Sequence, residues 1–277
     1  MGLQTYNDYR LKKIGQELNS SCPIIYPQIN HKPKKQLLKV TKHNEIWLIK
    51  IKQQSYIIKK AIKNSYLDQN NKKLLEEGRK LKILKHKNIV KCHSIYDKFN
   101  VYLVLDYIKG KTLEYILKNT LLNLSTIYKI TLEILGAIDF LHKMNIIHND
   151  LNPSNIIYSE DRQEIVIIDL GISTYTDSHQ SKMGAAQFAA PEQLLGQRPT
   201  YKTDIWAIGC ILFYCIEGHR PFKKNREQLD QKNIVISTII PNNFKKLILS
   251  MLELDSAKRP NINECIKEIN KLKMLCK

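Results

Sequence analysis

Three polar residues near the middle of the chain have the types and the spacing that a phosphoryl transfer would need. Asp150 and Asn155 belong to one short polar segment, and Asp169 follows fourteen positions after Asn155. Phosphoryl transfer asks for little covalent help, because its catalysis is mostly positioning of a hydroxyl and neutralisation of phosphate charge. A carboxylate can accept the hydroxyl proton, and oxygen ligands can hold magnesium. We therefore predict that Asp150 is the general base and that Asn155 and Asp169 bind Mg²⁺.

The segment that carries Asp150 resembles the catalytic loop of protein kinases, which is usually written H-R-D-L-K-P-x-N. The segment reads His148-Asn149-Asp150-Leu151-Asn152-Pro153-Ser154-Asn155, and Asp169-Leu170-Gly171 resembles the D-F-G motif that follows it. Three residues depart from the family pattern: Asn149 replaces Arg, Asn152 replaces Lys and Leu170 replaces Phe. Small-molecule phosphotransferases share the catalytic-loop pattern, so it does not decide the family by itself.

Three later motifs favour protein kinases. They are Ala190-Pro191-Glu192, Asp204-Ile205-Trp206-Ala207-Ile208-Gly209 and Lys258-Arg259-Pro260. They resemble the A-P-E end of the activation segment, the D-x-W-x-x-G helix behind it, and the arginine that pairs with the A-P-E glutamate. Because the motifs occur in the order of the family, the resemblance covers roughly residues 36–277.

The resemblance implies an α+β, two-lobed protein-kinase-like fold. A small N-lobe, residues 36–107, would be a mainly antiparallel β-sheet with one helix. A larger C-lobe, residues 108–277, would be mainly α-helical. Residues 1–35 contain three prolines and little periodicity, which indicates a loosely structured N-terminal extension.

The hydrophobic pattern predicts elements that agree with this fold. Apolar alternation and short apolar runs predict a first strand from residue 36 onward. They predict further strands at 46–51, 56–59, 89–90 and 101–105. The first three would form an antiparallel meander. Helical periodicity predicts helices over 74–84, 124–141 and 205–216 and short helices within 242–275.

The resemblance also implies that the N-lobe binds ATP. Tyr56-Ile57-Ile58-Lys59 resembles V-A-I-K, which makes Lys59 the phosphate-contacting lysine. Its helix partner would be Glu77, with Glu76 as the alternative. Residues 106–108 resemble the hinge whose backbone meets adenine. The ATP-binding residues predicted in this way are Ile46, Ile57, Lys59, Glu77, Leu105, Asp106, Ile108 and Ile157.

Two departures predict weak ATP binding. The family covers the phosphates with G-x-G-x-x-G-x-V, but Lys39, Thr41 and Asn44 stand at the glycine positions here. A side chain forced into the left-handed conformation would cost about 1–2 kcal/mol, so we expect the loop to take another shape and to hold phosphates less well. Ile57 stands where the family has Ala, and crowding of adenine would cost about 1–3 kcal/mol, or roughly one to two powers of ten in affinity.

Other departures concern the activation segment. The catalytic-loop Lys of the family bonds a Thr before A-P-E, and Asn152 and Ala185 stand at those positions here. Because both partners change together, no polar group is orphaned, and we expect the site to persist with less charge stabilisation. Asn149 lacks the charge with which the Arg of the family binds a phosphate on the segment, so we expect phosphorylation there to matter little. The hydroxyl residues of the segment are Ser173, Thr174, Tyr175, Thr176, Ser178 and Ser181.

The composition of the 277-residue chain suits one enzyme with two lobes, since 43% of its residues are hydrophobic. It has no apolar run that would span a membrane and no signal peptide, so we predict a cytoplasmic protein. The six cysteines lack the spacing of a zinc site and are predicted to be reduced and mostly buried. The net charge of +18 comes from scattered lysines without interleaved aromatic residues, so no dedicated nucleic-acid site is predicted.

We therefore predict an ATP- and Mg²⁺-dependent kinase that phosphorylates Ser or Thr in a protein substrate. The enzyme would be constitutively competent or controlled by a regulatory partner. One alternative is a pseudokinase, a binding module that keeps the fold without efficient catalysis. Another is a small-molecule phosphotransferase, which is disfavoured because such enzymes do not generally carry A-P-E and D-x-W-x-x-G.

Overall fold

The computed structural model describes residues 34–51, 53–62, 67–97, 100–176, 184–222 and 234–275, together with Leu229. Apart from its last two positions, the predicted N-terminal extension lies outside the described residues. The chain divides into two compact units. Of the described residues, unit 1 contains those up to Lys85 and those within Val90–Tyr107, and unit 2 contains His86–Ile89 and those from Ile108 onward.

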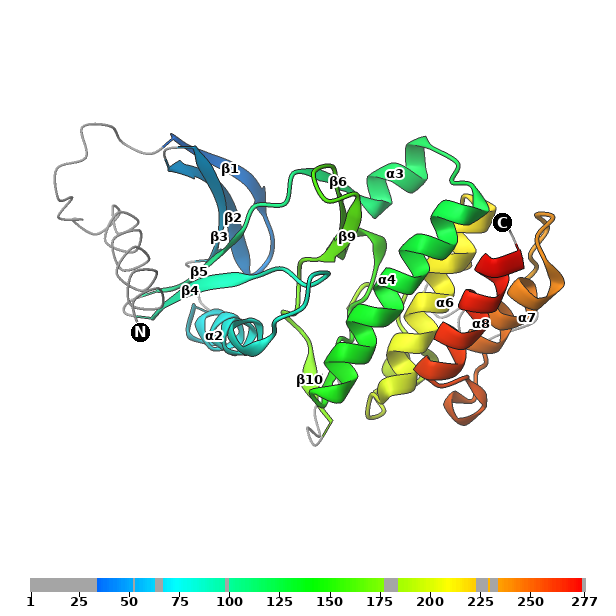
Figure 1. The fold of residues 1–277 in the computed structure, drawn as a ribbon. Coiled ribbons are helices and arrows are strands. Elements are labelled where there is room, and N and C mark those ends of the chain that lie inside the picture. The colour runs from blue at the N-terminus through cyan, green and yellow to red at the C-terminus, as the bar shows by residue number, and fades with distance from the viewer. Residues whose placement is uncertain are drawn as a thin grey trace, which may run out of the picture. The chain divides into compact units, whose positions relative to one another are not determined.

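Unit 1 is built on a five-stranded antiparallel sheet in the order β1-β2-β3-β5-β4 (Figure 1). Its strands are β1 (Lys34–Val40), β2 (Asn44–Ile51), β3 (Gln54–Ala61), β4 (Cys92–Asp97) and β5 (Val101–Asp106). The predicted meander and the predicted strand at 101–105 are confirmed. The predicted strand at 89–90 is wrong, because Ile89 makes only an isolated bridge to Ile167. The strand of this region is β4, where His93 and Ser94 interrupt the apolar pattern.

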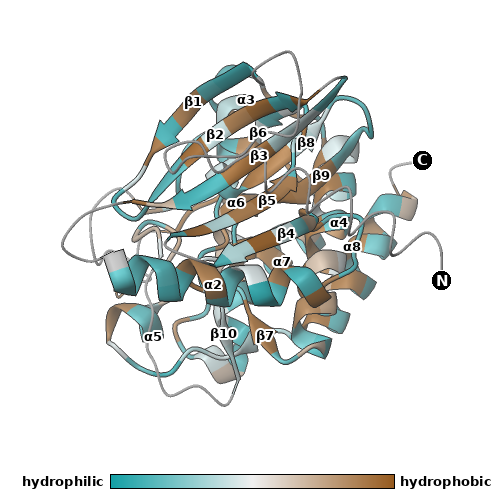
Figure 2. Cartoon of the chain, turned by 90° about the vertical axis from the view of Figure 1, so that its left-hand side faces the viewer, coloured by the Kyte–Doolittle hydropathy of each residue, from teal (hydrophilic) through white to brown (hydrophobic). Residues whose placement is uncertain are grey.

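The two faces of this sheet carry different side chains. Ile49, Ile58 and Val104 form a buried apolar cluster on one face. The other face packs against α2 (Leu67–Ile83), which begins at residue 67 rather than at the predicted residue 74. Gly78 permits the close approach of α2, since a Cβ there would lie 2.5 Å from Leu103 Cδ2. Figure 2 shows α2 as mostly hydrophilic with a few hydrophobic positions, as an amphipathic surface helix requires.

The β1–β2 turn closes without glycine. Thr41 Oγ1 accepts hydrogen bonds from the backbone N–H groups of His43 (3.3 Å) and Asn44 (2.9 Å), and it donates to Asn44 O (3.0 Å). None of Lys39, Thr41 and Asn44 has a positive φ, so the strain that left-handed residues would bring is absent. His43 also ties the turn to α2, because its Nδ1 lies 2.9 Å from Asn70 Oδ1. The turn is therefore closed by the Thr41 side chain, and its weaker hold on phosphates stays a prediction.

Unit 2 is mainly helical. Its helices are α3 (Leu113–Asn119), α4 (Leu124–Lys143), α5 (Pro191–Leu194), α6 (Tyr201–Glu217), α7 (Asn242–Met251) and α8 (Ile262–Leu275), with 3₁₀ turns η1 (Pro153–Asn155) and η4 (Ser256–Lys258). Its short strands are β6 (Gly110–Thr112), β8 (Ile156–Ser159) and β9 (Glu164–Ile167) in one sheet, and β7 (Ile146–Ile147) and β10 (Thr174–Tyr175) in another. The predicted α+β class is confirmed. The short strands were not predicted, because two to four residues are too few to show a period.

The core of unit 2 lies around α4 and α6. Helix α4 packs against both α6 and α8, as Figure 1 also shows. Helix α6 is buried from Thr203 to Ile216, and Trp206 is completely inaccessible to solvent. A helix that is apolar all round must lie inside the unit, so the predicted central position of 205–216 is confirmed.

The four cysteines that the structure describes are reduced and buried, as predicted. Four cysteines, Cys92, Cys210, Cys215 and Cys265, are free and buried. Burial raises the pKa of the Cys92 thiol to about 11, so this thiol stays protonated near neutral pH.

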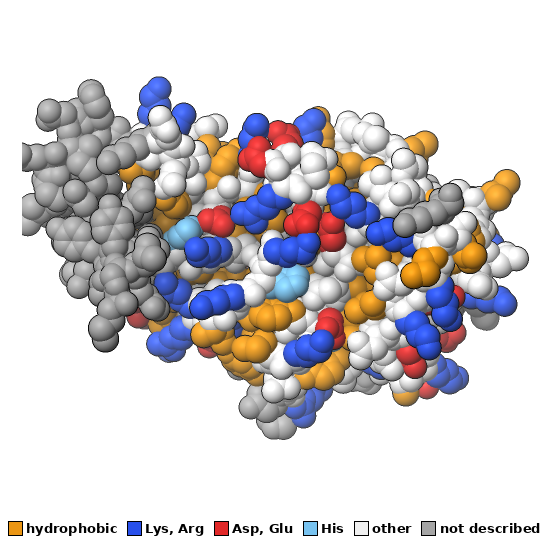
Figure 3. All heavy atoms as spheres, in the orientation of Figure 1, with side chains coloured by type: hydrophobic (Ala, Val, Ile, Leu, Met, Phe, Trp, Pro, Cys, Tyr) orange, Lys and Arg blue, Asp and Glu red, His pale blue; other side chains and the backbone are white. Residues whose placement is uncertain are grey.

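On the face drawn in Figure 3, Lys and Arg side chains lie among acidic and uncharged ones. No helix in the described part of the chain is both long and apolar enough to cross a membrane.

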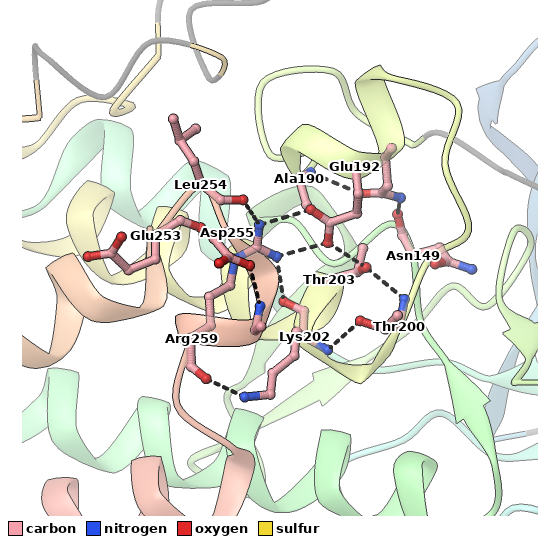
Figure 4. Close-up of polar contacts among 12 residues, drawn as sticks. Asn149, Ala190, Glu192, Thr200, Lys202, Thr203, Glu253, Leu254, Asp255 and Arg259 are labelled. Carbon is pink, nitrogen blue, oxygen red and sulfur yellow. Dashed lines mark hydrogen bonds and ion pairs between the residues drawn. The ribbon is translucent and has the colours of Figure 1, made fainter.

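A buried ion pair joins Glu192 of α5 to Arg259, which directly follows η4 (Figure 4). Arg259 Nη1 and Nη2 donate to the two carboxylate oxygens of Glu192 at 2.8 and 2.9 Å. The remaining Arg259 donors bond the carbonyl oxygens of Lys202, Glu253 and Leu254. All five guanidinium N–H groups can therefore be satisfied. Burial raises the pKa of the Glu192 carboxyl, but the hydrogen bonds and charge of Arg259 outweigh burial and hold the pKa below its ordinary value of 4.5.

Replacing Arg259 by Ala is expected to lower the free energy of unfolding by about 3–5 kcal/mol, because it leaves the Glu192 carboxylate buried without its cation. The lowered pKa makes this contribution complete above pH 4.5 and removes it as the pH falls through the pKa of the folded state. The loss caused by Arg259→Ala should therefore shrink in acid. Denaturant titrations at several pH values measure it.

Lys271→Ala is the matched control, since Lys271 forms an exposed ion pair with Glu268. It should change the stability by no more than about 1 kcal/mol. Equal effects of the two substitutions would contradict the structural role of the buried pair.

Candidate active site

Unit 1 pairs the predicted phosphate-contacting lysine with the predicted glutamate. Lys59 Nζ lies 2.8 Å from both carboxylate oxygens of Glu77, and both side chains are buried. The alternative partner, Glu76, is exposed. Strand β3 directs Lys59 toward α2 because Ile58, its neighbour, points to the opposite apolar cluster. The apolar pattern of one strand and the period of one helix thus position this ion pair.

The other predicted residues of unit 1 divide between the two faces of the sheet. Ile46 lies directly opposite Lys59, and Ile57 lies directly opposite Leu105. Directly opposed residues of antiparallel strands share a face, so these four side chains share one face. Asp106 lies opposite Tyr56 on the other face, and its carboxylate lies 2.5 Å from His93 Nε2. Its predicted role at the hinge would therefore use its backbone rather than its side chain.

Two predicted ATP-binding residues belong to unit 2. Ile108 is buried at the start of this unit. Ile157 is half-buried in β8, opposite Thr112 of β6 and Val166 of β9. Their roles toward a nucleotide stay predictions.

The predicted catalytic loop, residues 148–155, is anchored by one buried carboxylate of α6. Asp204 accepts hydrogen bonds from the backbone N–H groups of His148 (2.9 Å) and Asn149 (3.0 Å). His142, at the end of α4, places its Nε2 2.8 Å from the same carboxylate. Asp150 N then donates to His148 Nδ1 at 3.2 Å. These contacts fix the backbone on which Asp150 stands, and both histidines take part in them.

Three amide groups surround the side chain of Asp150. Asn155 Nδ2 donates to Asp150 Oδ2 (2.9 Å), Asn152 Nδ2 donates to Oδ1 (3.0 Å), and the Ala185 backbone N–H donates to Oδ1 (2.7 Å). We predicted that the replacement of both family partners, at positions 152 and 185, orphans no polar group. The structure adds that both residues bond the carboxylate of Asp150.

The two predicted magnesium ligands are neighbours. The backbone N–H of Ile168 donates to Asn155 O at 2.9 Å, which brings Asp169 beside the catalytic loop. Asn155 uses its Nδ2 for Asp150, so its amide oxygen is the atom left to meet a cation. Asp169 Oδ1 accepts from Gly171 N at 2.8 Å, which orients the carboxylate. Amide and carboxylate oxygens are the ligands that Mg²⁺ prefers, so the residues present fit this ion.

Asn149 holds the start of the predicted activation segment through hydrogen bonds between uncharged groups. It adopts a left-handed conformation (φ 66°) that asparagine tolerates better than most residues. Its Nδ2 donates to Thr174 Oγ1 (2.8 Å) and to Ile172 O (3.3 Å). Thr174 is therefore buried and already bonded, whereas Tyr175 is 41% exposed. The hydroxyl residues at 178 and 181 lie outside the described residues.

Comparison with known proteins decides the family. The sequence pattern of the protein kinase domain matches residues 47–269. The chain belongs to the protein kinase domain family. The human Serine/threonine-protein kinase ULK1 is 30% identical over 226 residues, which make up 74% of this chain and 22% of that protein.

Two further relatives of this protein kinase domain show similar coverage. The probable serine/threonine-protein kinase MARK-A of Dictyostelium discoideum is 31% identical over 221 residues, 75% of this chain and 21% of its own length. The rat 3-phosphoinositide-dependent protein kinase 1 is 34% identical over 194 residues, 65% of this chain and 34% of its own length. The kinase domain thus spans between 21% and 34% of the length of these three relatives.

Sequence reasoning missed several polar contacts of this kinase domain. The Asn149–Thr174 bond, the Asn152–Asp150 bond and the His93–Asp106 pair join residues that carry no periodic signal. One signal was available: an asparagine directly before Pro153 is typical of a cap, and Asn152 Oδ1 indeed accepts from Ser154 N.

Removal of phosphate from the activation segment is expected to change the rate of transfer by less than about tenfold, or about 1.4 kcal/mol. The reason is that Asn149 provides hydrogen bonds but no charge for a phosphate. Kinetics of the protein before and after phosphatase treatment, with mass spectrometry of the segment, measure the effect. Asn149→Arg is the control, since it restores the cation and should make the phosphorylated form faster. A larger loss in the unsubstituted protein would contradict the prediction.

Proposed function

We propose that this kinase domain transfers the γ-phosphoryl group of ATP to Ser or Thr hydroxyls of a protein substrate. The observation that carries the proposal is the buried contact of Lys59 with both carboxylate oxygens of Glu77 at 2.8 Å. Protein kinases need this pair in place for the lysine to steady the phosphates. Burying two charges costs desolvation free energy. A chain without nucleotide chemistry would gain little from keeping them.

Residues of unit 2 would act on the substrate hydroxyl and hold the magnesium ion. Asp150 would accept the proton of the substrate hydroxyl, because it is the carboxylate that the anchored catalytic loop presents. Asn155 and Asp169 would hold Mg²⁺, which when bound supplies positive charge toward the phosphates. Lys59 would add a further positive charge. Catalysis would consist of positioning and charge neutralisation, as phosphoryl transfer requires.

The choice of Ser or Thr as acceptor is supported by the relatives. All three named relatives are protein kinases, and two carry serine/threonine in their names. Residues 36–277 remain the proposed kinase domain. A cytoplasmic location is part of the proposal, because the ATP that the reaction consumes is held inside cells.

A second candidate function is that of a kinase-fold binding module with little or no catalysis. The observation that favours it is the glycine-free β1–β2 turn, whose Asn44 N–H is bonded by the Thr41 hydroxyl. Such an amide is already occupied and would not meet a phosphate. Both candidates bind partners through the same fold, and only transfer of phosphate separates them.

The first test replaces the acidic residues of the proposed site. Asp150→Ala should lower transfer of labelled phosphate from ATP by at least about 10²-fold, as the loss of a positioned general base typically does. Asp169→Ala should abolish transfer, because it removes a magnesium ligand that the apolar neighbours Ile168 and Leu170 cannot replace. Asp161→Ala is the control, because Asp161 is an exposed acidic residue whose Lys109 partner lies 3.9 Å away. If the unsubstituted protein transfers phosphate and both site variants transfer it equally well, the proposed roles are refuted. No transfer by the unsubstituted protein would favour the binding module.

The second test concerns Ile57. Ile57→Ala should tighten ATP binding by roughly one to two powers of ten, because it removes a side chain that crowds the adenine and the space is filled by ligand. Titration calorimetry with ATP and magnesium measures the change. Ile51→Ala is the control, since Ile51 packs against the apolar cluster on the opposite face of the sheet. Weaker binding by Ile57→Ala would mean that Ile57 supports the nucleotide.

A further inference from the structure

The two oxygens of the Asp150 carboxylate have different surroundings. Each carboxylate oxygen can accept about two hydrogen bonds. Oδ1 receives two, from Asn152 Nδ2 (3.0 Å) and from the Ala185 backbone N–H (2.7 Å). Among the described residues, only Asn155 Nδ2 donates to Oδ2, at 2.9 Å. Oδ1 is therefore saturated, and Oδ2 keeps one acceptor position.

The two donors on Oδ1 are themselves held in place. Asn152 is buried, its Oδ1 accepts from Ser154 N at 3.0 Å, and its Nδ2 also donates to the backbone oxygen of Asp150 at 3.0 Å. This pattern fixes which end of the Asn152 amide faces Asp150. A lysine at this position could donate to Asp150, but it could not accept from Ser154 N.

Gly184 allows the second donor to come close. A Cβ at Gly184 would lie 2.5 Å from Asp150 Cγ, which no real contact of this kind permits. Gly184 does not have a left-handed backbone, so the need for glycine here is one of space. The segment that carries Ala185 thus rests directly on the carboxylate of Asp150.

We propose that Asn152 and the Ala185 N–H act together as a neutral clamp that turns Oδ2 of Asp150 toward the acceptor hydroxyl. This inference rests on the proposed function. The hydroxyl oxygen bonds the γ-phosphorus while the bond from that phosphorus to the bridging oxygen of ADP breaks. The hydroxyl proton passes to Oδ2 and leaves to solvent after the product departs. Asn152 is a positioning residue in this scheme, because it acts through Asp150 and not on the substrate.

The clamp implies that the lysine usual in the family would harm this chain. Asn152→Lys loses the acceptor for Ser154 N, and with it the bond that fixes the donor to Asp150. Asn152→Asp is the sharper test, since aspartate caps a helical turn as well as asparagine does. It differs in presenting a carboxylate, instead of a donor, to Oδ1 of Asp150.

The experiment measures transfer of labelled phosphate from ATP to a degenerate mixture of Ser- and Thr-containing peptides, for the full chain and its variants. Asn152→Asp and Gly184→Ala should each lower kcat by about 10- to 100-fold, because misplacement by about 1 Å has effects of this size. The KM for ATP should change less than kcat.

Gly136→Ala is the control for the glycine substitution, because a Cβ at Gly136 meets no atom within 4 Å. Thermal unfolding of every variant identifies any that does not fold. An unchanged kcat in Asn152→Asp would overturn the clamp while leaving the proposed function in place. Higher activity in Asn152→Lys would overturn it as well. An unsubstituted protein that transfers nothing to peptides would overturn the proposed function, and the clamp with it.

Discussion

The arrangement of unit 2 depends on the carboxylate of Asp204. A buried carboxylate is stable only when donors replace the water that it has lost. Here the donors come from the end of α4 and from the backbone of His148 and Asn149. The catalytic loop is therefore fixed to the central helix through its main chain, independently of the side chains that it presents. This explains how the loop keeps its place while two family positions, 149 and 152, have changed to asparagine.

The asparagines form a common pattern. This chain has asparagine at two positions where the family has an arginine and a lysine. Both side chains donate hydrogen bonds, and each residue also has a special backbone role. Asn149 adopts the left-handed conformation, and Asn152 caps the 3₁₀ turn η1. An amide donor has no charge of its own, so it needs no compensating charge as an arginine or a lysine would. The two asparagines thus hold the loop through directional hydrogen bonds from uncharged donors.

The sequence predicted the fold wherever a period was long enough to read. Helix α6 and strands β2 and β3 were predicted because their apolar residues follow the helical or strand period over whole elements. The Lys59–Glu77 and Glu192–Arg259 pairs could be predicted from the resemblance. The clamp on Asp150 could not, because it uses a backbone N–H and an amide that is separated from Ala185 by 33 positions, and neither leaves a pattern in the sequence. The strand β4 was misplaced because its polar residues hide the alternation.

The hydrogen bonds of the β1–β2 turn also affect the entropy of ligand binding. Thr41 closes the turn on itself, and His43 joins it to Asn70 of α2. A loop that is ordered before the ligand arrives loses little conformational freedom when the ligand binds. Whatever molecule meets this edge of the sheet therefore avoids the ordering cost that a glycine-rich loop imposes. The hydrogen bonds that occupy the Asn44 amide thus also lower the entropic cost of contact.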